Sequence, residues 1–191
     1  MRVITKTVYT YAEILKLGNT RAIERARTWL ADAATPYEWW EAVYDYWNAE
    51  LEKVGFVEPE INFSGFWSQG DGASFTAVID IEKAVAIDSK YARLGRLIDW
   101  VSGVVERTSH QYCHENTCRV VLNPIYDAPH TLAMAYEFRD DLEDLRKQLC
   151  RKIYADLQKE YEWLTSDENL KELSEINDFT FDENGRIECS T

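Results

Sequence analysis

The sequence predicts an α+β fold in which β-hairpins form a mainly antiparallel sheet that packs against several helices. Short segments with period-two alternation flank glycine-containing reversals, as in β-hairpins. Apolar residues at steps of three and four run through 131–164, which predicts one long helix in the C-terminal half. A chain of 191 residues suits one compact domain, so we expect a single domain over 1–191.

A capping box marks the start of the first predicted helix. Residues 2–9 are rich in β-branched types, which predicts a first strand. Thr10 and Glu13 follow in T-x-x-E spacing, so each side chain can satisfy an otherwise unpaired amide at a helix start. We therefore expect a short helix over 11–17 and a second helix from Thr20.

A second T-x-x-E sequence predicts the next helix. Thr35 is the expected N-cap, Pro36 occupies the first helical position, and Glu38 completes the box. The helix should continue to about Lys53, because Gly55 then supplies a typical helix end.

The run INFSGFWSQGDGASFTAVID predicts a β-hairpin. Residues 61–68 and 74–80 alternate, and the glycines between them supply backbone angles that other residues resist. We expect the large rings of the first piece, Trp67 included, to pack on one face. The glycine-rich reversal would then serve the backbone geometry of the turn and not a chemical reaction.

The same kinds of signal, which are apolar spacing, helix caps and turn residues, predict the remaining elements. We expect a helix over 89–107, and Ser166 should cap a short helix that ends near Ile176. Two further hairpins are expected to turn on two-residue sequences, Glu115-Asn116 and Asn184-Gly185.

Charge and composition exclude several classes of function. The chain carries 34 acidic and 21 basic residues and a net charge of -13, which repels nucleic-acid backbones and anionic membranes. We expect no direct nucleic-acid or membrane binding, and a partner with a basic surface. The four cysteines are too few for a disulfide-built scaffold, which favours free thiols in a cytoplasm.

The segment SQGDGA offers a first candidate site. Its glycines can aim backbone N–H groups at a phosphate or carboxylate, although the acid at the tip opposes an anion. The alternative is a surface turn whose Asp supports local hydrogen bonds. The candidate ligand-binding residues are Ser64, Ser68, Gln69, Gly70, Asp71, Gly72 and Ser74.

An H-x2-C-H-x3-C pattern offers a second candidate, a zinc site. Imidazole and thiolate ligands suit zinc, but alternation along extended strands places them on opposite faces. If the turn falls at Glu115-Asn116, Cys113 and Cys118 would lie opposite each other. Ordinary strand residues are the favoured interpretation, so we expect no cofactor. The candidate metal ligands are His110, Cys113, His114 and Cys118.

Acidic residues crowd the start of the long predicted helix. Acids near a helix N-terminus are stabilising, so a solvated face explains them without a function. The competing interpretation is an acidic surface that binds a basic partner. The residues concerned are Glu137, Asp140, Asp141, Glu143 and Asp144.

No catalytic constellation is visible. The serines of the glycine-rich segment have no neighbouring base in sequence, and no G-x-S-x-G elbow occurs. The sequence therefore assigns no catalytic residue and favours a binding protein over an enzyme.

The run INFSGFWSQGDGASFTAVID, with VYTYAEI, WWEAVYD and IYADLQKEYEWLTSDENLKELSEINDFTFDENGR, resembles an uncharacterised family of tailed-phage proteins whose core reads F-S-G-F-x-S-Q-G-D-G-A-S-F. Members are sometimes labelled antitoxin-like. The resemblance implies a viral protein that acts in the cytoplasm of an infected bacterium, and it carries over no site.

Together these observations predict a non-enzymatic phage accessory protein. It would bind and modulate a host protein, in defence or toxin-antitoxin control. The alternative is a protein that binds or processes a small anion or nucleotide at the hairpin over 64–75. The aromatic content suits a dimer interface as well as a monomer core, so the sequence leaves the oligomeric state open.

Overall fold

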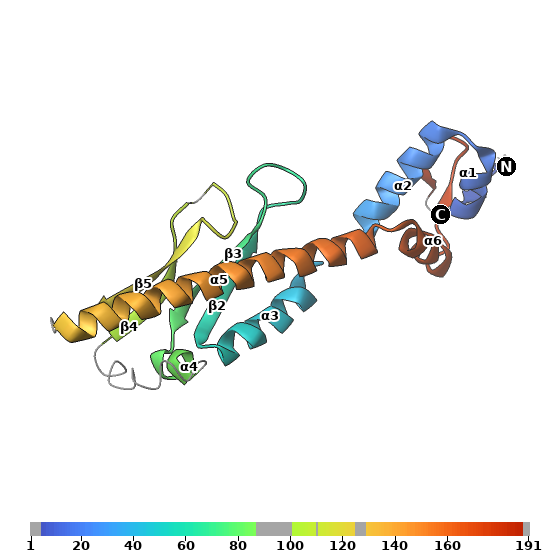
Figure 1. Cartoon of the computed structure of the whole chain (residues 1–191). Helices are drawn as coiled ribbons and strands as arrows, with labels where there is room; N and C mark the ends of the chain where they lie inside the picture. Colours follow the sequence, from blue (N-terminus) through green and yellow to red (C-terminus); the bar gives the residue numbers. More distant parts are fainter. Residues whose placement is uncertain (1–4, 87–100, 110, 125–128, 189–191) are drawn as a thin grey trace. The chain divides into compact units, whose positions relative to one another are not determined.

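The computed structural model describes residues 5–86, 101–109, 111–124 and 129–188, and it confirms the predicted α+β fold (Figure 1). The chain forms two compact units, and each is described by itself. Met1–Trp39 and Lys159–Thr191 form the first unit, and Trp40–Gln158 form the second. The long helix α5, Pro129–Leu164, contributes residues to both.

The first unit combines short helices with a small antiparallel sheet in the order β1-β6-β7. Its elements are β1 Tyr9–Thr10, α1 Tyr11–Leu17, α2 Thr20–Ala34, α6 Asp167–Ile176, β6 Thr180–Phe181 and β7 Ile187–Glu188. The predicted capping box is confirmed, since Thr10 and Glu13 bond reciprocally at the start of α1. The predicted cap at Ser166 and the final hairpin are confirmed as well, but Glu183 and Asn184, rather than Asn184 and Gly185, occupy the centre of its turn.

The apolar side of α2 forms the core of this unit. Ala22, Ala26 and Leu30 are buried at steps of four, as a helical stripe requires. Tyr11 and Phe181 close over them from the neighbouring elements, with ring centroids 6.3 Å apart.

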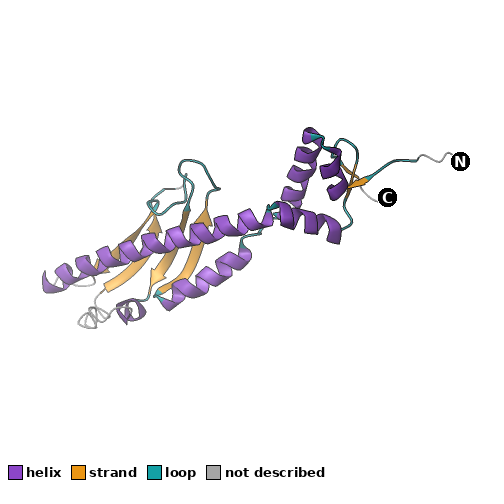
Figure 2. Cartoon of the chain, turned by 45° about the vertical axis from the view of Figure 1, so that its right-hand side comes forward, coloured by secondary structure: helices purple, strands orange, loops and turns teal. Residues whose placement is uncertain are grey.

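The second unit is built on a four-stranded antiparallel sheet in the order β2-β3-β4-β5. Its elements are α3 Glu41–Lys53, β2 Phe56–Phe63, β3 Ala73–Ile79, α4 Ile81–Ala86, β4 Val101–Arg107, β5 Cys118–Pro124 and the first part of α5. Helices α3 and α5 lie against the same face of the sheet (Figure 2).

Alternation along the strands builds one buried face of this sheet. Phe75, Ala77 and Ile79 of β3 are buried, whereas Val78 between them is 46% exposed. Buried side chains of α5 recur at helical spacing above that face and include Phe138, Leu142, Leu149, Ile153 and Leu157. The core therefore lies between the sheet and its helices, as the long apolar stripe predicted.

The prediction of a helix over 89–107 is wrong for its last seven residues, which form β4. Residues 89–100 lie outside the described part of the chain. The sequence VSGVVER is rich in valine, which suits a strand. Gly103 fits there because a Cβ would lie 2.7 Å from Leu122 of the adjacent strand.

The predicted capping box at Thr35 is also wrong. Thr35 ends α2, and its hydroxyl donates to the Ala31 carbonyl oxygen. Glu38 has a φ of +72°, so it is not helical, and α3 begins only at Glu41. The first predicted strand is shorter than expected: residues 5–8 have no regular structure, and residues 1–4 are not described. In the described residues, no helix has the length and apolar content that a membrane crossing requires.

Candidate functional site

The β2–β3 loop, residues 64–72, packs against the β4–β5 loop at one end of the four-stranded sheet (Figure 1). Ser64 joins the two loops, because its hydroxyl oxygen accepts the backbone N–H of Cys113 at 3.4 Å. Gly72 allows the close approach, since a Cβ there would lie 2.5 Å from the Cβ of His114. A Cβ at Gly70 would lie 2.9 Å from the ring of Tyr112. The glycines therefore serve a contact between two loops.

The tip of this loop is closed by its own acid. The Asp71 carboxylate accepts the backbone N–H of Ser68 at 2.7 Å, and the Asp71 N–H donates to the Ser68 carbonyl at 3.1 Å. This Asp is thus the anion that faces the turn. An external anion would have to displace it.

The other predicted ligand-binding residues do not share one surface. Ser74 is 2% exposed and lies on β3, where it pairs with Asn62. Gln69 is exposed at the tip. The structure brings Ser64, Gly70 and Gly72 to the neighbouring loop, and it places Ser74 in the interior.

A row of aromatic side chains lies behind the loop. Phe63 and Phe66 stack with centroids 5.7 Å apart, and Phe66 lies 5.5 Å from both Trp67 and Tyr154. Trp40 continues the row at 5.5 Å from Phe63. We call this set the aromatic row; it consists of Trp40, Tyr44, Phe63, Phe66, Trp67 and Tyr154.

Trp67 forms the exposed end of the aromatic row. The prediction that its ring packs inward is wrong, because the residue is 66% exposed and lies beyond the end of β2. Its φ is +67°, a left-handed conformation that costs an L-residue about 1–2 kcal/mol. Such strain persists where the surroundings enforce it, and it is common at binding sites.

Tyr154 of α5 helps to hold the loop in this conformation. Its pKa is raised by burial and by the charge of Asp71, while a hydrogen bond from the Trp67 backbone N–H opposes the rise. The phenol oxygen therefore fixes the backbone of the strained residue. The loop presents Trp67 on a supported scaffold.

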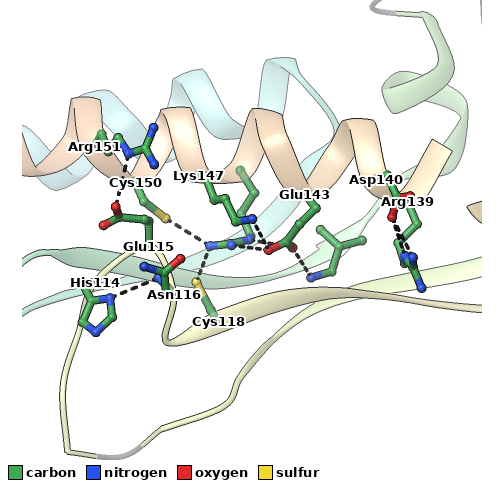
Figure 3. Close-up of polar contacts among 12 residues, drawn as sticks. His114, Glu115, Asn116, Cys118, Arg139, Asp140, Glu143, Lys147, Cys150 and Arg151 are labelled. Atoms are coloured by element: carbon green, nitrogen blue, oxygen red, sulfur yellow. Dashed lines mark hydrogen bonds and ion pairs between the residues drawn. The ribbon is translucent and has the colours of Figure 1, made fainter. Parts of the chain in front are cut away.

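The acidic residues of α5 differ in their surroundings, and Figure 3 draws the polar contacts of two of them, Asp140 and Glu143. The helix starts at Pro129 and has no acid in its first turn, so the helix dipole does not explain them. Glu137, Asp140 and Asp144 are exposed, and Asp140 also pairs with Arg139 at 2.6 Å. Glu143 and Asp141 are half-buried.

Glu143 has a structural role. Its carboxylate accepts the Nε–H of Arg146 at 3.0 Å and the backbone N–H of Val120 at 2.9 Å. Burial alone would raise the pKa of Glu143, but these hydrogen bonds and the arginine charge hold it below its ordinary value. The bond between Glu143 and Val120 connects α5 to β5.

Arg146 is fully buried, and its guanidinium lies between the thiols of Cys118 and Cys150, which Figure 3 labels. Its Nη1 lies 2.9 Å from the Sγ of Cys118 and 3.7 Å from that of Cys150. A hydrogen bond from Cys150 and the arginine charge lower the pKa of Cys118 to about 7, although burial opposes this. The pKa of Cys150 is raised by the bond to Cys118 and by burial.

The four residues of the zinc prediction are separated. Cys118 pairs with Arg107, not with Cys113, so the expected opposition of the two cysteines is wrong. The Nδ1 of His114 accepts the Asn116 N–H at 3.1 Å, and His110 lies outside the described residues. Glu115 and Asn116 do occupy the centre of a turn, closed by a bond from Thr117 N–H to the His114 carbonyl. No set of three potential metal ligands was found within the described residues.

Sequence reasoning missed two of these features. Trp67 was assigned to a strand, and nothing local distinguishes it from a buried ring. Arg146 did carry a signal, because it lies four residues after Leu142 and three before Leu149, on the apolar stripe itself. A cation at such a position indicates a buried partner.

The family described as a domain of unknown function, DUF8835, matches residues 39–167. The matched segment contains the whole second unit, and with it the aromatic row. No curated protein and no solved structure matches the chain. Because the match covers well over half of the sequence, the chain belongs to the DUF8835 family.

Proposed function

We propose that this chain is a non-enzymatic binding protein that docks on a partner protein through Trp67 and the aromatic row behind it. The observation that carries the proposal is an exposed tryptophan in a strained conformation, held by a well-bonded loop. Binding hot spots are enriched in tryptophan, and a preordered ring loses little entropy on binding.

The internal bonding of the loop supports binding rather than chemistry. Asp71 uses its carboxylate to close the turn, and Ser64 uses its hydroxyl to hold the neighbouring loop. A general base or nucleophile at this surface would need such groups free.

Charge complementarity supports a partner with a basic surface. The net charge of -13 would accelerate encounter with such a partner at low salt. Glu137 and Asp144 are exposed on α5 and would contribute to this attraction. The resemblance to the tailed-phage family supports a host protein in the cytoplasm of an infected bacterium as that partner, in defence or toxin-antitoxin control.

Capture from bacterial lysate tests this proposal with a matched pair of variants. Trp67→Ala removes the proposed anchor, and Trp163→Ala removes another tryptophan, 58% exposed, from the first unit. We expect the wild-type chain and Trp163→Ala to retain one stoichiometric partner, which Trp67→Ala loses. A partner that Trp67→Ala retains fully, or no stoichiometric partner at low salt, contradicts the proposal.

A further inference from the structure

A cavity in the first unit is lined mainly by cationic and amide side chains. Its volume is about 210 Å³. The lining residues are Asn19, Arg21, Ala22, Arg25, Asn184 and Arg186, all within the first unit. We call it the arginine cavity.

Two segments far apart in sequence build the arginine cavity. Arg21 and Arg25 lie one turn apart at the start of α2, so they share a face of the helix. Arg186 comes from the turn between β6 and β7. Gly185 brings this turn against the helix, because a Cβ there would lie 2.0 Å from the Ala22 carbonyl oxygen.

The position of Arg25 is fixed by this contact. Its Nη1 donates to the Asn184 carbonyl oxygen at 2.9 Å, and the residue is half-buried. Arg21 and Arg186 are exposed at the same cavity. The cavity thus has one anchored guanidinium and two that can adjust to a ligand.

Within the described residues, no carboxylate forms a direct ion pair with Arg21, Arg25 or Arg186. Asp182 lies near Arg186 and lowers the local positive charge in part, but its Oδ1 accepts the backbone N–H groups of Asn184 at 2.8 Å and Arg186 at 2.9 Å. Like charges gathered in this way repel one another, and an anion would relieve that repulsion.

We propose that the arginine cavity binds a phosphate group, either free or carried as a monoester by a small molecule. Guanidinium groups match the oxygens of phosphate in bidentate geometry. The positive end of the α2 dipole adds to their attraction, and the Asn19 cap marks that end. The chain's net charge of -13 makes such a cationic cavity a local exception.

The volume limits the ligand. A space of 210 Å³ equals that of about seven water molecules. A phosphate group therefore fits, together with the atoms next to it in a small ester. It is smaller than the roughly 300 Å³ at which pockets for drug-sized ligands begin.

Calorimetric titration of the full chain with inorganic phosphate and with glycerol phosphate tests the proposal. Arg21→Gln and Arg186→Gln each remove one exposed guanidinium. Lys171→Gln is the matched control, because it removes one exposed charge from the same unit and does not line the cavity.

We expect one ligand to bind per chain, with an affinity that falls about tenfold in each arginine variant, since a charged hydrogen bond is lost. Lys171→Gln should bind as the wild type does. Binding of phosphate alone identifies the free ion, and binding of the ester identifies a small-molecule phosphate. If neither binds, or if the arginine variants bind like Lys171→Gln, the proposal is wrong. The partner-protein proposal concerns Trp67 in the other unit and stands independently of this result.

Discussion

The Glu143 carboxylate accepts the backbone N–H of Val120 at 2.9 Å, so a helix side chain bonds to the edge strand of the four-stranded sheet. Edge strands with free amides are sites of uncontrolled pairing. The same carboxylate balances the charge of buried Arg146. One residue therefore protects the edge and neutralises an interior cation.

Glu143→Ala should lower the free energy of unfolding by about 3 kcal/mol, because it leaves a buried arginine without its counterion. Glu137→Ala, on the same helix and exposed, should change it by no more than about 0.5 kcal/mol. Urea unfolding measures both. Equal stabilities for the two variants would contradict the structural role of Glu143.

The buried thiols predict a pH dependence of stability. The pKa of Cys118 is about 7 in the folded chain and 9.0 without the fold, so between these values the unfolded state holds a proton that the folded state lacks. The free energy of unfolding should therefore rise with pH in this window, by at most about 1.4 kcal/mol per pH unit. The contribution of Cys118 to the free energy of unfolding should disappear as the pH falls through 7.

Cys118→Ala should lack this part of the slope, whereas Cys113→Ala should keep it, because Arg146 and Cys150 contact Cys118. Urea unfolding under reducing conditions at a series of pH values makes the comparison. Identical slopes for the two variants would show that Cys118 is not a stabilised thiolate.

Gly72→Ala tests the contact between the two loops. A Cβ at Gly72 would lie 2.5 Å from the Cβ of His114, so one loop must move, at a cost of about 2 kcal/mol or more. Gly18→Ala is the comparison, because it has a φ of +68° but no atom within 4 Å of the added Cβ. It should cost about 1 kcal/mol through backbone strain alone. Thermal unfolding that ranks Gly18→Ala as the worse variant would refute the packing role of Gly72.

Sequence patterns identified the elements whose signals are local. The apolar stripe of α5 persists over many turns, and the Thr10 and Glu13 box lies within four residues. The prediction of a helix at 101–107 was wrong because the valines there, at steps of three and one, fit a helix stripe as well as a strand. Pairing with β3 and β5 decided in favour of the strand.

The candidate site depended on contacts that sequence spacing does not contain. The glycines of the β2–β3 loop were expected to supply backbone angles for the turn, but the sequence did not show that their neighbours Tyr112 and His114 come from another hairpin. Arg21 and Arg186 meet only because a hairpin packs on the start of α2. A sequence pattern does not contain such long-range contacts, so it does not by itself show which residues form a site.

The expectation of a single domain over 1–191 is tested by calorimetry. The structure divides into two units that share α5, and this shared helix favours one cooperative transition. Two resolved transitions, of which Gly72→Ala lowers only one, would show that the units unfold separately.

Two substitutions of Trp67 distinguish the effect of backbone strain on stability from the effect of the ring on binding. Trp67→Gly and Trp67→Ala remove the same ring, but glycine accepts a φ of +67° without steric cost. The glycine variant should therefore be the more stable by about 1 kcal/mol, and neither should bind the partner. An alanine variant at least as stable as the glycine variant would mean that the backbone is not strained there.

The most direct test of the central claim is the Kd of the purified partner for Trp67→Ala and for Trp163→Ala. If Trp67 is the anchor of the interface, its removal should weaken binding about 30-fold or more, the loss typical of a hot spot. Trp163→Ala should bind like the wild type. A wild-type Kd for Trp67→Ala would contradict the account.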